Sequence, residues 1–170
     1  MKLPICYFCA RTKVLCPRDQ ERLERGEISE LDVELSHELV MLKESKFSKL
    51  DKLEFLRAIK VDDYLFLIVR GLNSLGSQLA AQVARELGKK GYGRVRLIEE
   101  AHDVRRLVSQ ILYPTRVMGV DITWFPDGSS EYSVRVPRSD LKRMPYTRKD
   151  AEKILETMLG RRVRIVPVPR

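Results

Sequence analysis

Three cysteines and one aspartate near the start of the chain have the spacing of a metal site. Cys6 and Cys9 form a C-x2-C pair, and Cys16 and Asp19 repeat that spacing with a carboxylate in place of the second thiol. A tetrahedral zinc ion can take two thiolates from one tight turn, and a second pair completes its coordination. Because a carboxylate also binds zinc, the sequence predicts a zinc site formed by Cys6, Cys9, Cys16 and Asp19.

The same residues allow three other interpretations. His37 could supply the fourth ligand, although it lies in a segment expected to be helical and to face solvent. The site could instead have lost its metal and kept reduced, buried thiols. A disulfide is the remaining alternative, but three cysteines cannot all pair, and a reducing compartment disfavours the bond.

The beginning of the chain gives no sign of export. Arg11, Lys13 and Arg18 interrupt it, so it lacks the continuous apolar stretch of a signal peptide. No run of about twenty apolar residues occurs anywhere, so no membrane span is expected. We therefore expect a cytoplasmic protein.

The motifs of common enzyme classes are missing from the sequence. There is no G-x-x-x-x-G-K-[ST] phosphate loop, no G-x-G-x-x-G fingerprint, no H-E-x-x-H motif and no G-x-S-x-G elbow. The two histidines, His37 and His102, offer few candidates for general acid–base catalysis. We expect a binding protein without a small-molecule substrate, not an enzyme.

Positive charge is concentrated at the C-terminal end. The formal net charge is +8, and the segment from Arg135 to Arg170 holds 11 Lys or Arg against 4 Asp or Glu, which leaves +1 for the rest. Abundant Lys, Arg and Glu with a single asparagine, Asn73, are typical of heat-adapted proteins, but their charges tend to balance in networks. The local excess therefore favours a surface that contacts the phosphates of a nucleic acid.

Two stretches of the chain predict the same order of elements. In each, two β-prone runs flank a turn, at Asp62-Asp63 in the first and at Asp127-Gly128 in the second. A capping pattern at Ser29 and Asp32 starts a helix before the first copy. The expected helices cover 29–44, 76–91, 102–112, 139–144 and 147–160, and the expected strands cover 54–61, 64–71, 93–100, 119–126, 130–137 and 161–168.

This repeat predicts an α+β fold with two ββααβ modules. Each module is expected to have a three-stranded sheet with helices on one face. The expected division is a cysteine-bearing, zinc-knuckle-like element over 1–28, a first module over 29–113 and a second module over 114–170, with the boundary near residues 113–118.

The second module resembles the last KH module of the NusA transcription factors and of archaeal NusA-like proteins. The family pattern has a "VP-x-x-x-L" strand end, a helix ending in "L-x-G" and a "V-x-I" strand. The matching residues here are Val136, Pro137, Leu141, Leu159, Gly160, Val163 and Ile165. The first module, through "ARELGKKGYGRVRLIEE", is similar to the first KH module of that family, and the resemblance spans residues 29–167.

The resemblance implies type II KH modules that bind RNA. It implies a role in transcription elongation or termination on nascent transcripts with RNA polymerase. The ribosome is an equally reasonable partner, because tandem KH-like modules with basic tails and zinc knuckles also dock on ribosomal RNA.

The loops that carry the family's GxxG motif depart from it. The first reads Asn73-Ser74-Leu75-Gly76, where asparagine can replace glycine in left-handed backbone. The second, over 145–148, has no glycine, so RNA contact there must come from side chains, with Tyr146 available to stack on a base. The alternative is a KH scaffold that has lost RNA binding and contacts proteins. The expected RNA-binding residues are Arg70, Asn73, Ser74, Gly76, Lys89, Lys90, Arg138, Lys142, Arg143, Tyr146, Arg148, Lys149, Arg161 and Arg162.

Overall fold

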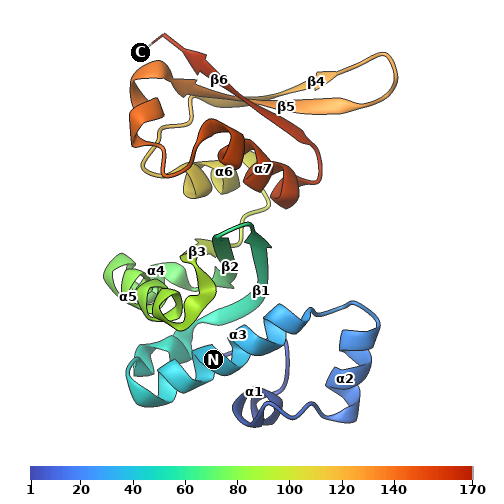
Figure 1. Ribbon diagram of the computed structural model, residues 1–170, viewed down its shortest axis with the longest axis vertical. Helices are drawn as coiled ribbons and strands as arrows, with labels where there is room; N and C mark the ends of the chain where they lie inside the picture. Colours follow the sequence, from blue (N-terminus) through green and yellow to red (C-terminus); the bar gives the residue numbers. More distant parts are fainter. Residues whose placement is uncertain (170) are drawn as a thin grey trace. The chain divides into compact units, whose positions relative to one another are not determined.

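The computed structural model describes residues 1–169 and divides into two compact units, each with its own three-stranded sheet and helices (Figure 1). The N-terminal unit is Met1–Glu100, and the C-terminal unit begins at Ala101. The fold is therefore α+β, as expected. None of the helices within residues 1–169 has the length and hydrophobicity that a membrane span requires.

The cysteine-bearing segment forms two short helices that pack on a longer one. They are α1 (Tyr7–Thr12) and α2 (Pro17–Glu24), and the longer helix is α3 (Glu30–Ser45). A small core joins them, with Ile5, Cys9, Ala10, Ile28 and Val40 all buried. Residues 1–28 thus belong to the N-terminal unit and do not form a separate domain.

The start of α3 follows the capping pattern seen in the sequence. The Ser29 hydroxyl accepts a hydrogen bond from the Asp32 backbone N–H at 3.0 Å, and the Asp32 carboxylate accepts one from the Ser29 N–H at 2.9 Å. The other carboxylate oxygen of Asp32 accepts a 2.7 Å bond from the Ala58 N–H in the sheet. One buried aspartate therefore both caps the helix and joins it to the first strand.

The sheet of the N-terminal unit combines a hairpin with a parallel strand. β1 (Glu54–Val61) pairs antiparallel with β2 (Tyr64–Arg70), and β2 pairs parallel with β3 (Arg94–Glu99). The turn lies at Asp62 as expected, with left-handed backbone at φ +52°. η1 (Ser48–Lys52) precedes β1. Three elements connect β2 to β3: α4 (Leu72–Leu75), α5 (Ser77–Leu87) and η2 (Gly88–Tyr92).

The C-terminal unit repeats this order of elements and strand directions. It begins with α6 (Val104–Leu112), and β4 (Gly119–Trp124) pairs antiparallel with β5 (Ser130–Pro137). Then come η3 (Arg138–Arg143), α7 (Arg148–Leu159) and β6 (Arg162–Val168), which pairs parallel with β5. From α3 in the N-terminal unit, with η1 and η2 left aside, and from α6 in the C-terminal unit, the order is helix, strand, strand, short helix, longer helix, strand.

The division between the units falls before α6, whereas the sequence placed it after that helix, near residues 113–118. The reason is packing, because α6 contacts α7 and β4 of the C-terminal unit. Val108, Ile111 and Leu112 on α6 are fully buried. The repeat is therefore complete in both units, each with a helix ahead of its first strand.

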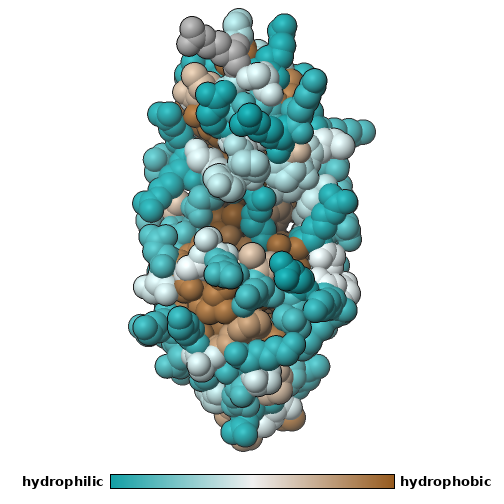
Figure 2. Space-filling view, turned by 90° about the vertical axis from the view of Figure 1, so that its left-hand side faces the viewer, coloured by the Kyte–Doolittle hydropathy of each residue, from teal (hydrophilic) through white to brown (hydrophobic). Residues whose placement is uncertain are grey.

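Polar and charged side chains cover most of the face drawn in Figure 2, with hydrophobic residues showing in patches between them. This agrees with a chain in which 33% of residues are charged.

Candidate functional site

The four predicted metal ligands come together in the N-terminal unit. One ligand atom from each of Cys6, Cys9, Cys16 and Asp19 can be chosen so that all lie within 4.8 Å of one another. Ligands about 2.3 Å from a tetrahedral zinc ion are roughly 3.8 Å apart, so the cluster has the dimensions of such a site. Cys9 and Asp19 are buried and Cys6 is exposed, which places the cluster near the surface. This group can hold a metal ion.

Two equivalent helix starts form the cluster. Cys6 is the N-cap of α1 and Cys9 lies three residues on, and Cys16 and Asp19 hold the same two positions on α2. Each N-cap donates its backbone N–H to the other helix's ligand: Cys6 N–H to an Asp19 carboxylate oxygen at 3.0 Å and Cys16 N–H to the Cys9 sulfur at 3.1 Å. Asp19 therefore stands where a fourth cysteine would complete the symmetry.

The protonation of the cluster depends on burial and on these hydrogen bonds. Burial, with the neighbouring Cys6 thiol, raises the pKa of Cys9 to about 12. The backbone N–H of Asp19 lowers the pKa of Cys16. Burial acts to raise the pKa of Asp19, but bonds from the Cys6 N–H and from neighbouring side chains outweigh it, and the net shift is downward. A metal ion would supply the positive charge that a Cys9 thiolate needs.

Arg22 supports the aspartate from its other side. Its guanidinium donates to an Asp19 carboxylate oxygen at 3.2 Å and to the Pro4 carbonyl at 2.6 Å. Three thiolates and a carboxylate around a divalent cation carry a formal charge of about −2, which this arginine partly offsets. The sequence pattern did not identify Arg22, although its place one helical turn after Asp19 is the usual spacing of such a partner.

The structure contains neither a disulfide between the cysteines nor His37 as a fourth ligand in the cluster. All three cysteines are free, and the Cys6 and Cys9 sulfurs are 3.0 Å apart, well beyond a disulfide bond length. His37 is not in the cluster, because its Nδ1 lies 2.7 Å from the Ala10 carbonyl and links α3 to α1.

Six of the basic residues expected to bind RNA are exposed on the C-terminal unit and form no salt bridge within residues 1–169. We call this set the unpaired cations: Arg138, Lys142, Arg143, Lys149, Arg161 and Arg162.

The other basic residues expected to bind RNA are paired. Arg70 bonds to Glu54 and Glu100 at 3.0 Å each, and Lys89 lies 3.5 Å from Glu86. Lys90 pairs with Glu38, and Arg148 pairs with Glu152 one turn along α7 at 3.3 Å. The structure thus separates two kinds of basic residue that the sequence had grouped together.

The stacking role expected of Tyr146 is wrong, because this side chain belongs to the core. Tyr146 is only 8% exposed, and its hydroxyl donates a 2.9 Å hydrogen bond to the Ile111 carbonyl on α6. A tyrosine ring can be buried when its hydroxyl has a hydrogen-bond partner such as a carbonyl. The position of Tyr146 in a loop does not show whether such a partner is present.

The first loop keeps left-handed backbone, but at glycines and not at Asn73 as expected. Asn73 and Ser74 lie within the short helix α4, which Gly71 (φ +91°) and Gly76 (φ +89°) bracket. The Gly71 and Leu72 N–H groups donate to the Glu99 carboxylate at 3.2 and 3.0 Å. The chain's own glutamate therefore occupies the start of α4, whereas Gly76 opens onto free space.

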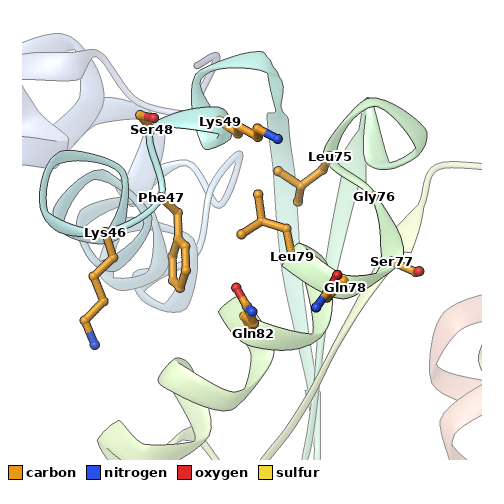
Figure 3. A pocket seen from close by; sticks show the side chains of 10 residues that line it. All are labelled: Lys46, Phe47, Ser48, Lys49, Leu75, Gly76, Ser77, Gln78, Leu79 and Gln82. Carbon is orange, nitrogen blue, oxygen red and sulfur yellow. The ribbon is translucent and has the colours of Figure 1, made fainter.

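A groove of about 650 Å³ lies beside Gly76 (Figure 3). Leu75 and Leu79 give it an apolar floor, and Lys49 extends from η1 on the opposite wall. The groove also borders the first turn of α5, whose N-cap Gly76 offers no side-chain acceptor. Backbone N–H groups at such a helix start favour an anion. The lining residues are Lys46, Phe47, Ser48, Lys49, Leu75, Gly76, Ser77, Gln78, Leu79 and Gln82.

The sequence analysis did not identify the exposed hydrophobic residues at the tip of the β4–β5 hairpin. Ile122, Trp124 and Phe125 there are 46%, 64% and 39% exposed. The run Ile122 to Phe125 is more apolar than a strand with a solvent-facing side requires, and it was the signal that could have identified this patch.

Comparisons with known proteins do not assign the chain to a family. No family model matches it, and no curated protein matches it. Among solved structures it is similar to the one described as "Crystal structure of APE1850", with a TM-score of 0.49 and 17% sequence identity. That similarity covers 67% of this chain and 88% of the other.

Proposed function

We propose that the protein binds RNA without catalysing a reaction, through two KH-like modules of which the C-terminal one makes the main contact. The observation that carries this proposal is the set of unpaired cations. Six exposed positive charges that form no salt bridge with a carboxylate of residues 1–169 attract a polyanion, because each phosphate they neutralise releases a bound counterion.

The order of elements supports a KH-like module in each unit. Each unit has a helix, two antiparallel strands, two further helices and a strand parallel to the middle one. A type II KH module would have this order, which is the support for this part of the proposal. The groove beside Gly76 borders the loop in which a KH module would bring a nucleic-acid backbone close to a glycine, which supports a contact there. We propose it as a secondary RNA contact.

The two loops that would carry the GxxG motif indicate which kind of RNA the protein binds. The second loop has no glycine, and the first has its left-handed residues five apart, at Gly71 and Gly76. Phosphate contacts through long side chains position a protein on RNA without reading its sequence. We therefore propose contact with structured or nascent RNA in transcription or on the ribosome, inside the cytoplasm.

We further propose that Cys6, Cys9, Cys16 and Asp19 bind one zinc ion that stabilises the N-terminal element. Zinc matches a donor set of three sulfurs and one oxygen in a compact cluster. Metal analysis of protein prepared without chelator should give about one zinc per chain. Protein without metal and with an unchanged fold would contradict a structural zinc.

Anisotropy of labelled single-stranded RNA tests the RNA proposal with matched variants. Arg138→Ala with Lys142→Ala removes two unpaired cations, whereas Lys89→Ala with Lys90→Ala removes two that are paired with Glu86 and Glu38. The first pair should weaken binding of unrelated RNA sequences about equally and clearly more than the second.

Two results would oppose the proposal. An equal loss of RNA affinity in both double variants would mean that total charge, and not the unpaired cations, attracts RNA. No measurable RNA binding by the unaltered protein would leave a protein-interaction role on the same scaffold.

A further inference from the structure

The β4–β5 hairpin carries an apolar face that becomes exposed toward the tip of the hairpin. Ile122 and Trp124 lie on the same side of the sheet as Val134, because they pair with Tyr132 and Ser130. Exposure rises along that face from 0% at Val134 to 46% at Ile122 and 64% at Trp124. Figure 1 shows why, since the hairpin extends past the ends of α6 and α7.

An arginine holds one side of this aromatic face in place. Arg161 follows the end of α7 at Gly160, and its guanidinium lies 5.3 Å from the centre of the Trp124 ring and 5.8 Å from that of Tyr132. A 2.5 Å hydrogen bond from Arg161 to the Ser130 hydroxyl fixes the guanidinium at the strand edge. Arg161 and its neighbour Arg162 form no salt bridge with a carboxylate of residues 1–169.

The chemistry of this patch matches one kind of occupant. A protein partner would bury the apolar residues but would need an acidic group for Arg161. A nucleotide satisfies both at once, because its base has a flat apolar face and its phosphate is an anion. Aromatic rings beside arginines are the usual means of holding unpaired bases in single strands.

We propose that Trp124, backed by Arg161, is a stacking platform for a base of single-stranded RNA, with Arg161 binding the adjacent phosphate. This inference rests on the proposed RNA-binding function and adds a base-contacting site at the hairpin.

The chain reports on this site directly, because Trp124 is its single tryptophan. Titration with short oligoadenylate should quench the intrinsic tryptophan fluorescence, while dye anisotropy on the same RNA measures binding independently. Inorganic polyphosphate supplies the anion without bases, so it should compete through the arginines and leave the tryptophan emission nearly unchanged.

The two readouts separate the failure of this proposal from failure of the proposed function. Quenching that follows the anisotropy curve supports the platform. Anisotropy change with unaltered tryptophan emission overturns the platform and leaves RNA binding intact. No anisotropy change at all overturns both, and the hairpin is then a protein-binding face.

Variants test the same point without fluorescence. Trp124→Leu keeps an apolar group and should weaken single-stranded RNA binding by roughly five-fold to a hundred-fold, the range that loss of one stacked base produces. Its salt dependence should not change, because no charge is lost. Ile122→Ala is the matched control, since it trims the same face without removing a ring. Equal effects of both variants would overturn stacking and indicate simple apolar contact.

Discussion

The side chains that support the cysteine cluster decide how firmly it holds a metal ion. Arg22 bonds to both Asp19 and the Pro4 carbonyl, so it fixes the carboxylate and offsets its charge. Arg22→Ala should lower zinc affinity by about ten-fold, as loss of such supporting partners commonly does. Competition with a chromogenic zinc chelator measures this. Arg25→Ala, an exposed arginine on the same segment, should have little effect, and equal losses from both would refute the role of Arg22.

The thiols of the metal-free protein should differ in reactivity. Thiolates react with alkylating reagents and thiols do not, and burial raises the pKa of Cys9 to about 12 while the pKa of Cys16 is lowered. At neutral to mildly alkaline pH, mass spectrometry should therefore find Cys16 labelled well before Cys9. Adding zinc should protect all three cysteines. Prompt labelling of Cys9 in the folded, metal-free protein would contradict the buried geometry.

Single residues were predictable where spacing determines chemistry. The metal cluster was predictable from two pairs, Cys6 with Cys9 and Cys16 with Asp19, each separated by two residues. Residues three apart at the start of a helix lie close together, so each pair can supply two ligands. The prediction for Tyr146 was wrong because a loop residue can point into the core when its hydroxyl has a carbonyl to bond to. Here that carbonyl belongs to Ile111, and its position depends on how α6 packs. The pairing of Lys90 with Glu38, far apart in the sequence, was likewise invisible.

Among the elements, α3 depends on a buried aspartate that caps it and also joins it to β1. Asp32→Ala removes the acceptor of the Ser29 and Ala58 N–H groups and leaves the latter unsatisfied in the sheet. The free energy of unfolding should fall by about 1–3 kcal/mol. Urea unfolding followed by circular dichroism measures this, with Glu30→Ala as an exposed control on the same first turn. Loss below about half a kcal/mol would mean that water replaces both bonds.

In the C-terminal unit, Asp140 on η3 anchors the segment that follows α6. Its carboxylate accepts bonds from the Arg116 side chain and backbone N–H, which lower the pKa of Asp140 to about 2 from 3.8. A carboxyl with a lowered folded-state pKa stabilises the fold above its unfolded pKa, and that stability is lost as pH falls from about 4 to about 2.

Asp140→Asn checks this pH dependence. The variant should be less stable than the unaltered protein at neutral pH, and the difference should shrink as pH falls from about 4 toward 2. Urea midpoints measured across that range give the comparison. A stability difference that stays constant with pH would show that the carboxylate charge contributes nothing.

Most elements were predictable because their ends carry local signals. The Ser29–Asp32 box, the turns at Asp62 and Gly128 and the left-handed Gly160 all act within a few residues. The assignment of α6 to the C-terminal unit was not predictable, since it depends on which sheet the buried face of that helix covers.

Positive charge is distributed unevenly over the molecule, and the proposed RNA contact depends on this distribution. The excess at the C-terminal end was visible in the sequence, but only the structure separates paired cations such as Arg70 and Lys90 from the unpaired set. Basic residues that already form salt bridges contribute little to the free energy of RNA binding, because those salt bridges must break before the residues can bind phosphates.

The salt dependence of RNA binding tests this claim most directly. Affinity for a labelled single-stranded RNA is measured over a series of salt concentrations, for the unaltered protein and for Arg138→Ala with Lys142→Ala. Each cation on a phosphate contributes about 0.7 to the slope of log affinity against log salt, so the double variant should flatten the slope by about 1.4. An unchanged slope, or binding that ignores salt in the unaltered protein, would contradict RNA recognition by the unpaired cations.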